Sequence, residues 1–163
     1  MAVQDFSRSL PMRLYRALAV VMPRFRRIFA KAGLTEQQWR VLRVLWEQPS
    51  VPQSALVELT LIPAPSLIGV LDRLATAGLV ERRRGTGDRR VVEVAATAAG
   101  RALEERLMPD VQATYAALRA SLDESTWRAL ENGLDELIHA QQPREGVASG
   151  RPGAKHPSGE NIA

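Results

Sequence analysis

The stretch PSLIGVLDRLATAGLVERRRGTGDRRVVEV, residues 65–94, decides the fold of this chain, because its hydrophobic pattern changes period part-way along. Its first half predicts an amphipathic helix over residues 65–77 that ends at Gly78. Its second half predicts two extended runs, residues 79–84 and 89–94, joined by a glycine-rich tip. A short helix followed by a β-hairpin is therefore expected. The apolar face of the helix comprises Leu67, Val70, Leu71 and Leu74.

Two helices and a tight turn are expected before this stretch. Thr35 and Gln38 form a capping box, which predicts the start of a helix with an apolar face. Two prolines then break the chain, and Ser54 is expected to cap a short helix that runs to Leu59. The linker at residues 61–64 leads into the next helix. Helix, helix, tight turn, helix and hairpin is the order of a winged helix-turn-helix, whose recognition helix enters the major groove of DNA.

Longer amphipathic helices are expected on both sides of this winged module. The N-terminal helix spans residues 11–31 and carries a regular apolar stripe, and Pro23 predicts a kink in it. Two more helices follow the module, at residues 98–120, which Pro109 is expected to kink or divide, and at residues 123–141. Their apolar stripes are too long for a small winged module to cover, so we expect them to be buried against a second subunit.

The expected fold class is therefore mainly α with a small β-wing, a winged helix-turn-helix flanked by dimerisation helices. An N-terminal dimerisation helix occupies residues 8–33, and the DNA-binding domain occupies residues 34–96. C-terminal dimerisation helices follow at residues 97–142. Residues 143–163 are rich in glycine, proline and small polar side chains without apolar periodicity, which predicts a disordered tail.

Composition sets limits on function. The chain has 163 residues, of which 45% are hydrophobic and 25% charged, as in a soluble globular protein, and we expect a cytoplasmic protein without a membrane partner. It has no cysteine and two histidines, which excludes thiolate chemistry and leaves too few ligands for a multi-histidine metal site. Residues 1–96 carry a net charge of +7 and residues 97–142 a net charge of −4. This asymmetry indicates a polyanion-binding module joined to a part with another role.

The helix predicted at residues 65–77 has a second face that suits DNA. Opposite its leucines it carries small or hydrogen-bonding residues that can approach base edges, and an arginine that can reach a guanine or a phosphate. A solvated helix face is the alternative interpretation of the same pattern. The candidate DNA contacts are Pro65, Ser66, Ile68, Gly69, Asp72 and Arg73.

The predicted hairpin is a more specific signal, because five arginines surround its glycine tip. Arginines clustered on an exposed hairpin repel one another unless a polyanion relieves the repulsion, so DNA contact is predicted and solubility alone is the alternative. A phosphate-binding loop is excluded, since no Gly-Lys-Ser/Thr run follows the tip. The five are Arg82, Arg83, Arg84, Arg89 and Arg90, with Asp88 placed to orient one of them through a forked ion pair.

No arrangement in the sequence indicates catalysis. The chain lacks a His-Glu-x-x-His motif and a nucleophile elbow. The neighbouring Glu104 and Glu105 point to different sides of a helix and are expected to be solvated. We therefore expect no enzyme, no catalytic residue and no cofactor.

Five short motifs occur in a fixed order along the chain, and the resemblance that they carry covers residues 8–140. They are Leu34-Thr-Glu-Gln-Gln-Trp-Arg40, the helix Pro65–Leu74, Gly78-Leu-Val80, Asp88-Arg-Arg90 and Thr97-Ala-Ala-Gly100. This set resembles the MarR family of bacterial transcriptional regulators. Ser9-Leu-Pro-Met12, followed by Arg16, is most similar to the homoprotocatechuate-operon regulators within that family. The resemblance implies an obligate homodimer that places two winged modules on a pseudo-palindromic operator in double-stranded DNA.

The resemblance also assigns roles to single residues. Arg90 takes the place of the wing-tip arginine, and Asp88 takes that of the carboxylate that braces it. Ser66 and Arg73 match groove-facing positions of the recognition helix.

An effector pocket between the dimerisation helices and the winged module is implied as well, partly apolar and with one cation for a carboxylate. Alternatives are that Trp39 belongs to the core and that Arg40 pairs with an acid of the partner subunit.

The expected function is a repressor of an aromatic-compound catabolic operon that a phenolic or aromatic carboxylate releases from DNA. A winged-helix architectural or protein-interaction module without an effector is the alternative. The pocket candidates are Ser9, Arg16, Trp39 and Arg40.

Overall fold

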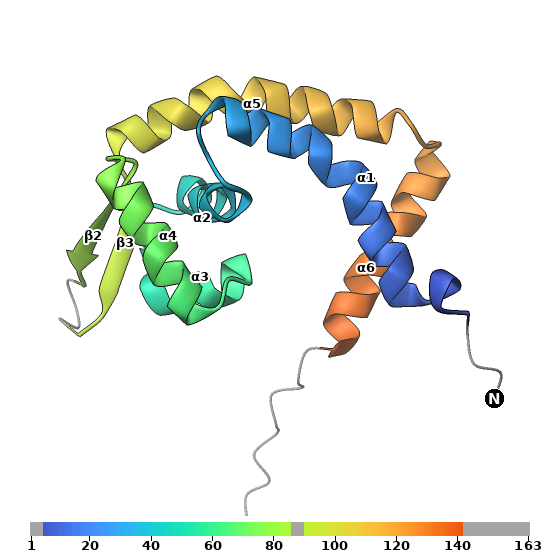
Figure 1. The fold of residues 1–163 in the computed structure, drawn as a ribbon, viewed down its shortest axis with the longest axis horizontal. Coiled ribbons are helices and arrows are strands. Elements are labelled where there is room, and N and C mark those ends of the chain that lie inside the picture. The colour runs from blue at the N-terminus through green and yellow to red at the C-terminus, as the bar shows by residue number, and fades with distance from the viewer. Residues whose placement is uncertain (1–4, 86–89, 142–163) are drawn as a thin grey trace, which may run out of the picture. The chain divides into compact units, whose positions relative to one another are not determined.

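The structure is a computed structural model that describes residues 5–85 and 90–141 of the chain. The expected hairpin tip and the expected tail lie outside the described residues. Contacts between residues divide the chain into two units, residues 1–122 and residues 123–163. The second unit contains α6 (Glu124–Gln141). The first contains η1 (Phe6–Arg8), α1 (Leu10–Lys31), α2 (Glu36–Glu47), β1 (Val51–Pro52), α3 (Gln53–Thr60), α4 (Ala64–Thr76), β2 (Val80–Arg84), β3 (Val92–Ala96) and α5 (Ala98–Arg119) (Figure 1).

Helices α2, α3 and α4 and a three-stranded antiparallel sheet form the winged module (Figure 1). The strand order is β1-β3-β2, so that β3 lies in the middle. Strand β1 is a structural element that the sequence did not predict, and its Val51 pairs with Val94 of β3. The expected fold class, mainly α with a small β-wing, is confirmed.

The second strand of the wing differs from the prediction, because it begins at Val92 and not at residue 89. The register places Val80 opposite Ala96 and Arg84 opposite Val92. The backbone N–H of Gly85 donates to the carbonyl of residue 91 at 2.8 Å, just beyond the last pair of the ladder. Strand β2 ends at Arg84, which pairs with Val92, so residues before Val92 have no residue of β2 to pair with.

Local capping signals fix several helix ends. The Thr35 hydroxyl accepts from the backbone N–H of Gln38 at 3.2 Å, and the Gln38 amide oxygen accepts from the backbone N–H of Thr35 at 2.9 Å, so the predicted capping box is confirmed. Gly78, with φ +70°, follows α4 in the left-handed conformation that glycine adopts without strain. The expectation that Ser54 caps α3 is wrong, because Pro52 is the N-cap and Ser54 lies inside the helix.

Both long helices of the first unit continue through a proline. Helix α1 runs unbroken past Pro23, and α5 runs unbroken past Pro109, so Pro109 does not divide the helix. A proline inside a helix removes one backbone hydrogen bond, and tertiary packing offsets that loss. Leu107 and Val111, on either side of Pro109, are buried and hold α5 in place. Helix α1 packs against α5 in the first unit (Figure 1).

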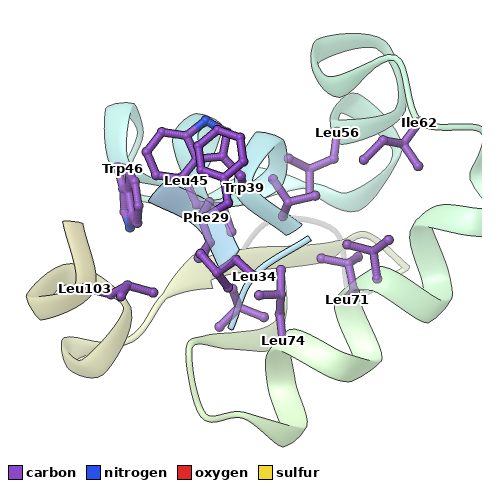
Figure 2. Packing of buried hydrophobic residues seen from close by; sticks show 14 of the residues in the cluster. Phe29, Leu34, Trp39, Leu45, Trp46, Leu56, Ile62, Leu71, Leu74 and Leu103 are labelled. Carbon is purple, nitrogen blue, oxygen red and sulfur yellow. The ribbon is translucent and has the colours of Figure 1, made fainter. Parts of the chain in front are cut away.

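The hydrophobic core of the first unit is continuous from the winged module to α1 and α5 (Figure 2). Aromatic rings occupy its upper part: Phe29 and Trp39 stack at 4.4 Å between centroids, and Trp46 meets Trp39 edge-on at 5.3 Å. Aliphatic side chains from α2, α3, α4 and the linker between α3 and α4 form another part of it, each with less than 2% of its surface exposed. They include Leu42, Leu45, Leu56, Ile62, Leu71 and Leu74.

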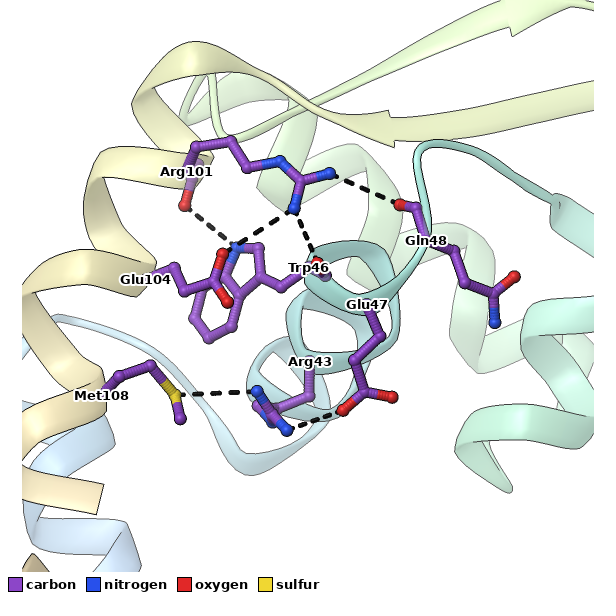
Figure 3. A network of polar contacts seen from close by, with 8 residues as sticks. Arg43, Trp46, Glu47, Gln48, Arg101, Glu104 and Met108 are labelled. Atoms are coloured by element: carbon purple, nitrogen blue, oxygen red, sulfur yellow. Dashed lines mark hydrogen bonds and ion pairs between the residues drawn. The ribbon is translucent and has the colours of Figure 1, made fainter. Parts of the chain in front are cut away.

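Polar contacts fix the start of α5 to the end of α2 (Figure 3). The indole N–H of Trp46 donates to the carbonyl of Gly100 at 3.0 Å, and Arg101 Nη1 donates to the carbonyl of Trp46 at 2.7 Å. Arg101 Nη2 donates to the carbonyl of Gln48 at 3.4 Å. A Cβ at Gly100 would lie 2.3 Å from the carbonyl oxygen of Leu79, so only glycine permits this approach. The winged module and the first turns of α5 are thereby joined.

Helix α6 begins after Asp123, whose carboxylate accepts from the backbone N–H of Thr126 at 2.9 Å and from the Thr126 hydroxyl at 2.7 Å. Hydrogen bonds from the Ser125 hydroxyl, and then from Thr126, lower the pKa of this exposed carboxyl well below its ordinary value. The helix carries an apolar stripe at intervals of four residues that is exposed in the single chain. Its members are Leu130, Leu134 and Ile138.

Candidate nucleic-acid interface and effector pocket

Helix α4 has the two faces that a recognition helix requires. Leu67, Val70, Leu71 and Leu74 are at most 1% exposed and anchor the helix in the core. On the opposite face the residues predicted to contact DNA are exposed, apart from Gly69, which is half-buried. The structure therefore presents Pro65, Ser66, Ile68, Asp72 and Arg73 together on one exposed face.

Two of the predicted DNA contacts, Asp72 and Arg82, lie against each other. Arg82 Nη1 is 2.7 Å from Asp72 Oδ1, and Arg82 Nη2 donates to the carbonyl of Ile68 at 3.4 Å. The first strand of the wing is thus attached to the recognition helix by an ion pair and a backbone contact. This arrangement positions the two elements predicted to contact DNA relative to each other, a role that sequence reasoning did not assign.

The arginines of the wing have different surroundings. Arg83 is paired with Glu81, whereas Arg84 is exposed and forms no ion pair with a described residue. Arg90 lies in the turn before β3 and is exposed. The remaining two predicted contacts, Asp88 and Arg89, lie outside the described residues, so their role stays a prediction.

A cavity of about 550 Å³ lies among α1, α2 and α5. Its wall is largely apolar and aromatic: the rings of Phe25 and Tyr115 are 4.9 Å apart, and Trp39 stacks on Phe29 beside them. Trp39 is 8% exposed, so it belongs to the core and lines the cavity as well. The apolar and aromatic lining residues are Leu18, Val21, Met22, Phe25, Phe29, Trp39, Leu61, Met108, Val111 and Tyr115.

Two arginines of α2 also line this cavity. Arg40 Nη1 donates to the carbonyl of Thr60 at 2.8 Å, while its Nε is buried and has no hydrogen-bond partner among the described residues. Arg43 Nη2 lies 2.6 Å from Glu47 Oε1, and Arg43 Nη1 faces the Met108 sulfur at 3.6 Å (Figure 3). Since a thioether is a weak acceptor, both guanidinium groups keep capacity to donate to an anion.

One carboxylate completes the polar part of the lining. Glu36 Oε2 is 3.0 Å from Arg26 Nε, and the Glu36 side chain is 35% exposed. Glu36, Arg40 and Arg43 follow one another at the spacing of one face of α2. One carboxylate and two guanidinium groups therefore border the same apolar space, together with the Gln112 amide.

The structure brings together two of the four residues predicted for the pocket. Trp39 and Arg40 line the cavity, whereas Ser9 and Arg16 are not among its lining residues in the single chain. The Ser9 hydroxyl donates to a backbone carbonyl of η1, and Arg16 is exposed on α1, so their assignment to the pocket stays a prediction. Sequence reasoning missed Arg43, although its distance of four residues from Trp39 indicates a shared helix face.

Within residues 5–85 and 90–141, no group of three or more histidine, cysteine, aspartate or glutamate side chains is arranged to hold a metal ion. No single helix in that part of the chain is long and apolar enough to cross a membrane. Helices α3 and α4 meet the length and composition criteria only as a pair, with a bend of 108° between them.

Comparison with known proteins agrees with this geometry. Residues 34–92 match the model of the MarR family. The homoprotocatechuate degradative operon repressor of Escherichia coli is 34% identical over 137 residues, which cover 84% of this chain and 93% of that protein. This chain belongs to the MarR family. Like its MarR relatives, it is a transcriptional regulator with a winged-helix DNA-binding fold.

Solved structures of other MarR proteins share the fold over most of the chain. NadR in complex with 4-hydroxyphenylacetate is 34% identical with a TM-score of 0.73, covering 88% of this chain and all of that one. The repressor CouR bound to a 23-mer DNA duplex is 28% identical with a TM-score of 0.75, covering 85% of this chain and 98% of that one. The resemblance stated from the sequence motifs is thus confirmed.

Proposed function

We propose that this MarR protein is a homodimeric repressor of an aromatic-compound catabolic operon, and that an aromatic carboxylate releases it from DNA. The observation that carries the proposal is the cavity among α1, α2 and α5, where a wall of aromatic rings borders two arginines. The NadR structure with 4-hydroxyphenylacetate supports this class of ligand, since that compound combines a ring with a carboxylate.

The cavity suits such a ligand in size and in chemistry. Its volume of about 550 Å³ falls within the range of small-molecule sites, and its apolar walls suit a ring. When a carboxylate binds at Arg43, the guanidinium exchanges its weak contact with the Met108 sulfur for a charge-assisted hydrogen bond. The buried Nε of Arg40 is a further donor for the same group. The Glu36 carboxylate is an acceptor for a phenolic hydroxyl at the border of the same space.

DNA binding in this proposal uses α4 and the wing. Helix α4 enters the major groove with its exposed face, and the wing approaches the neighbouring backbone and minor groove. Arg73 and Arg84, which form no ion pair with a described residue, are proposed phosphate or base contacts together with Arg90. The basic N-terminal part of the chain, net +7 over residues 1–96, favours this contact electrostatically.

Dimerisation is proposed from exposed apolar side chains on α1 and α6. Leu10, Tyr15 and Leu18 of α1 are 52%, 68% and 54% exposed, and the α6 stripe of Leu130, Leu134 and Ile138 is similarly open in the single chain. Apolar surface of this extent on amphipathic helices is typical of an obligate interface between subunits. Ligand binding would then favour a dimer conformation whose recognition helices no longer match half-sites about 34–36 Å apart.

The proposal is tested by titrating 4-hydroxyphenylacetate into the wild-type protein and the variant Arg43→Gln, with Arg24→Gln as the matched control. Arg24 lines a separate hollow of about 540 Å³ on another face of α1 and α5, beside Arg27 and Lys31. Loss of a charge-assisted hydrogen bond at Arg43 should weaken binding by about tenfold or more, while Arg24→Gln should bind as the wild type does.

Calorimetry measures the affinity, and a gel shift with and without the ligand measures release from DNA. At about 100 times its dissociation constant, the ligand should also stabilise the wild type by about 2.7 kcal/mol in a thermal-shift assay. Binding that is lost in Arg24→Gln and kept in Arg43→Gln would assign the effector to the basic hollow. No stabilisation by any aromatic carboxylate would favour a winged-helix protein without an effector.

A further inference from the structure

Ile68 is an exception among the aliphatic side chains of α4. Leu67, Val70, Leu71 and Leu74 are buried to 1% exposure or less, whereas Ile68 is 51% exposed on the opposite face. A branched aliphatic side chain has no polar group that water can solvate, so its exposure on this face is unfavourable in free energy. Its position suits a partner that offers apolar surface.

Two neighbours of Ile68 on this face, Pro65 and Gly69, offer no hydrogen-bonding side chain. Pro65 has no backbone N–H, and Gly69 has no side chain. One oxygen of the Asp72 carboxylate, Oδ1, accepts from Arg82 at 2.7 Å. Arg73 lies close to Gly69, since a Cβ at that glycine would be 3.5 Å from Arg73 Nη1. An apolar centre is therefore flanked by one cation and by the Ser66 hydroxyl.

The position of Ile68 is fixed relative to the wing. Its carbonyl accepts from Arg82 Nη2 at 3.4 Å, and Arg82 also holds Asp72 one helical turn further along. A wing seated on the DNA backbone thus fixes how far α4 enters the groove. The placement of α4 relative to the wing is thus set by contacts within one chain.

We propose that Ile68 reads thymine in each operator half-site through its C5-methyl group. The proposal rests on the proposed function only in that α4 enters the major groove. The thymine methyl is the apolar group that the major groove presents, whereas cytosine presents an amino donor at that edge and purines present polar atoms. Ile68 desolvates those polar groups without replacing their hydrogen bonds, so it selects thymine by contact with the methyl and by rejection of the other bases.

The experiment begins with selection of duplexes from a random library by the full-length protein, which gives its preferred half-site. Each thymine of that site is then replaced by deoxyuridine in both half-sites, which removes the methyl and leaves base pairing intact. At the position that faces Ile68, the wild type should lose about fourfold in affinity per half-site, as expected for one buried methyl group. Ile68→Ala should show a similar loss on the thymine operator and no further loss on deoxyuridine.

The control is Leu59→Ala, because Leu59 is also 51% exposed but lies on α3. This variant should bind as the wild type does and keep the preference for thymine over deoxyuridine. Indifference of the wild type to every deoxyuridine, a half-site without thymine, or an undiminished thymine preference in Ile68→Ala would each overturn the assignment. A selection that yields no consensus would overturn the repressor proposal too, whereas a consensus without methyl dependence would overturn only the role of Ile68.

Discussion

Helices α4 and α6 have the same kind of amphipathic sequence but different surroundings. In α4 the apolar stripe is at most 1% exposed, because α2, α3 and the sheet cover it. In α6 Leu130, Leu134 and Ile138 are 48%, 37% and 56% exposed. The winged module thus completes its core within one chain, whereas the apolar stripe of α6 stays exposed in the single chain and is proposed to lie at the dimer interface. One test of this difference is how stability depends on protein concentration.

The largest expected effect is the loss of a buried leucine from α4. Leu71 is fully buried, and Leu71→Ala should lower the free energy of unfolding by about 2–5 kcal/mol, since truncation leaves a cavity in a close-packed core. Urea denaturation followed by circular dichroism measures the change. The shift in midpoint should be similar at every protein concentration. A loss below about 1 kcal/mol would contradict a core completed within the winged module.

A charge placed in the stripe of α6 should act on association instead. Leu134→Asp should weaken the dimer, because an unpaired carboxylate at an apolar interface is costly to desolvate. Sedimentation equilibrium at micromolar concentrations should show monomer. The stability difference from the wild type should shrink as both proteins are diluted, because only the wild type gains stability from association. Asn132→Asp, which adds the same charge at an exposed position of α6 away from the stripe, is the control and should remain dimeric. A monomeric wild type would overturn the dimer proposal.

The contrast between α4 and α6 also explains which structural features the sequence predicts. The capping box at Thr35 and the helix end at Gly78 depend on neighbouring residues, so they are visible in the sequence. Strand β1 is not, because Val51 and Pro52 form too short a segment for any periodicity and gain their strand geometry from β3, far along the chain. Pro109 was expected to kink or divide α5. The sequence does not show that the helix stays continuous, because the burial that holds it is a tertiary property.

The candidate functional residues divide in the same way, into those visible from local motifs and those that depend on tertiary packing. Trp39 and Arg40 were expected at the effector pocket from a motif, and both line the cavity. Arg43 lies outside the motifs from which the pocket was predicted. Its place in the cavity depends on the packing of α5 against α2. Asp72 and Arg82 were assigned separately to DNA, because a sequence does not show that a helix and a strand ten residues apart meet in an ion pair.

The smallest expected effect on stability concerns that ion pair, and it tests whether the exposed face of α4 is organised within one chain. The Asp72 side chain is 57% exposed and that of Arg82 is 31% exposed, so Asp72→Asn should change the free energy of unfolding by less than about 1 kcal/mol. The effect of Asp72→Asn on DNA-binding affinity should depend on the sequence of the duplex. Removing a negative charge next to the DNA strengthens binding to a random duplex, whereas loosening Arg82 from α4 weakens binding to the selected operator.

The ratio of the two affinities, measured by fluorescence anisotropy at fixed salt concentration, should therefore fall in Asp72→Asn. Glu81→Gln is the matched control, because Glu81 is a carboxylate paired with a wing arginine but makes no ion pair with α4. It removes the same charge and should leave the ratio close to that of the wild type. An equal gain in affinity for both duplexes in Asp72→Asn would show that Asp72 acts only through its charge. The recognition helix and the wing would then bind DNA without depending on their mutual contact.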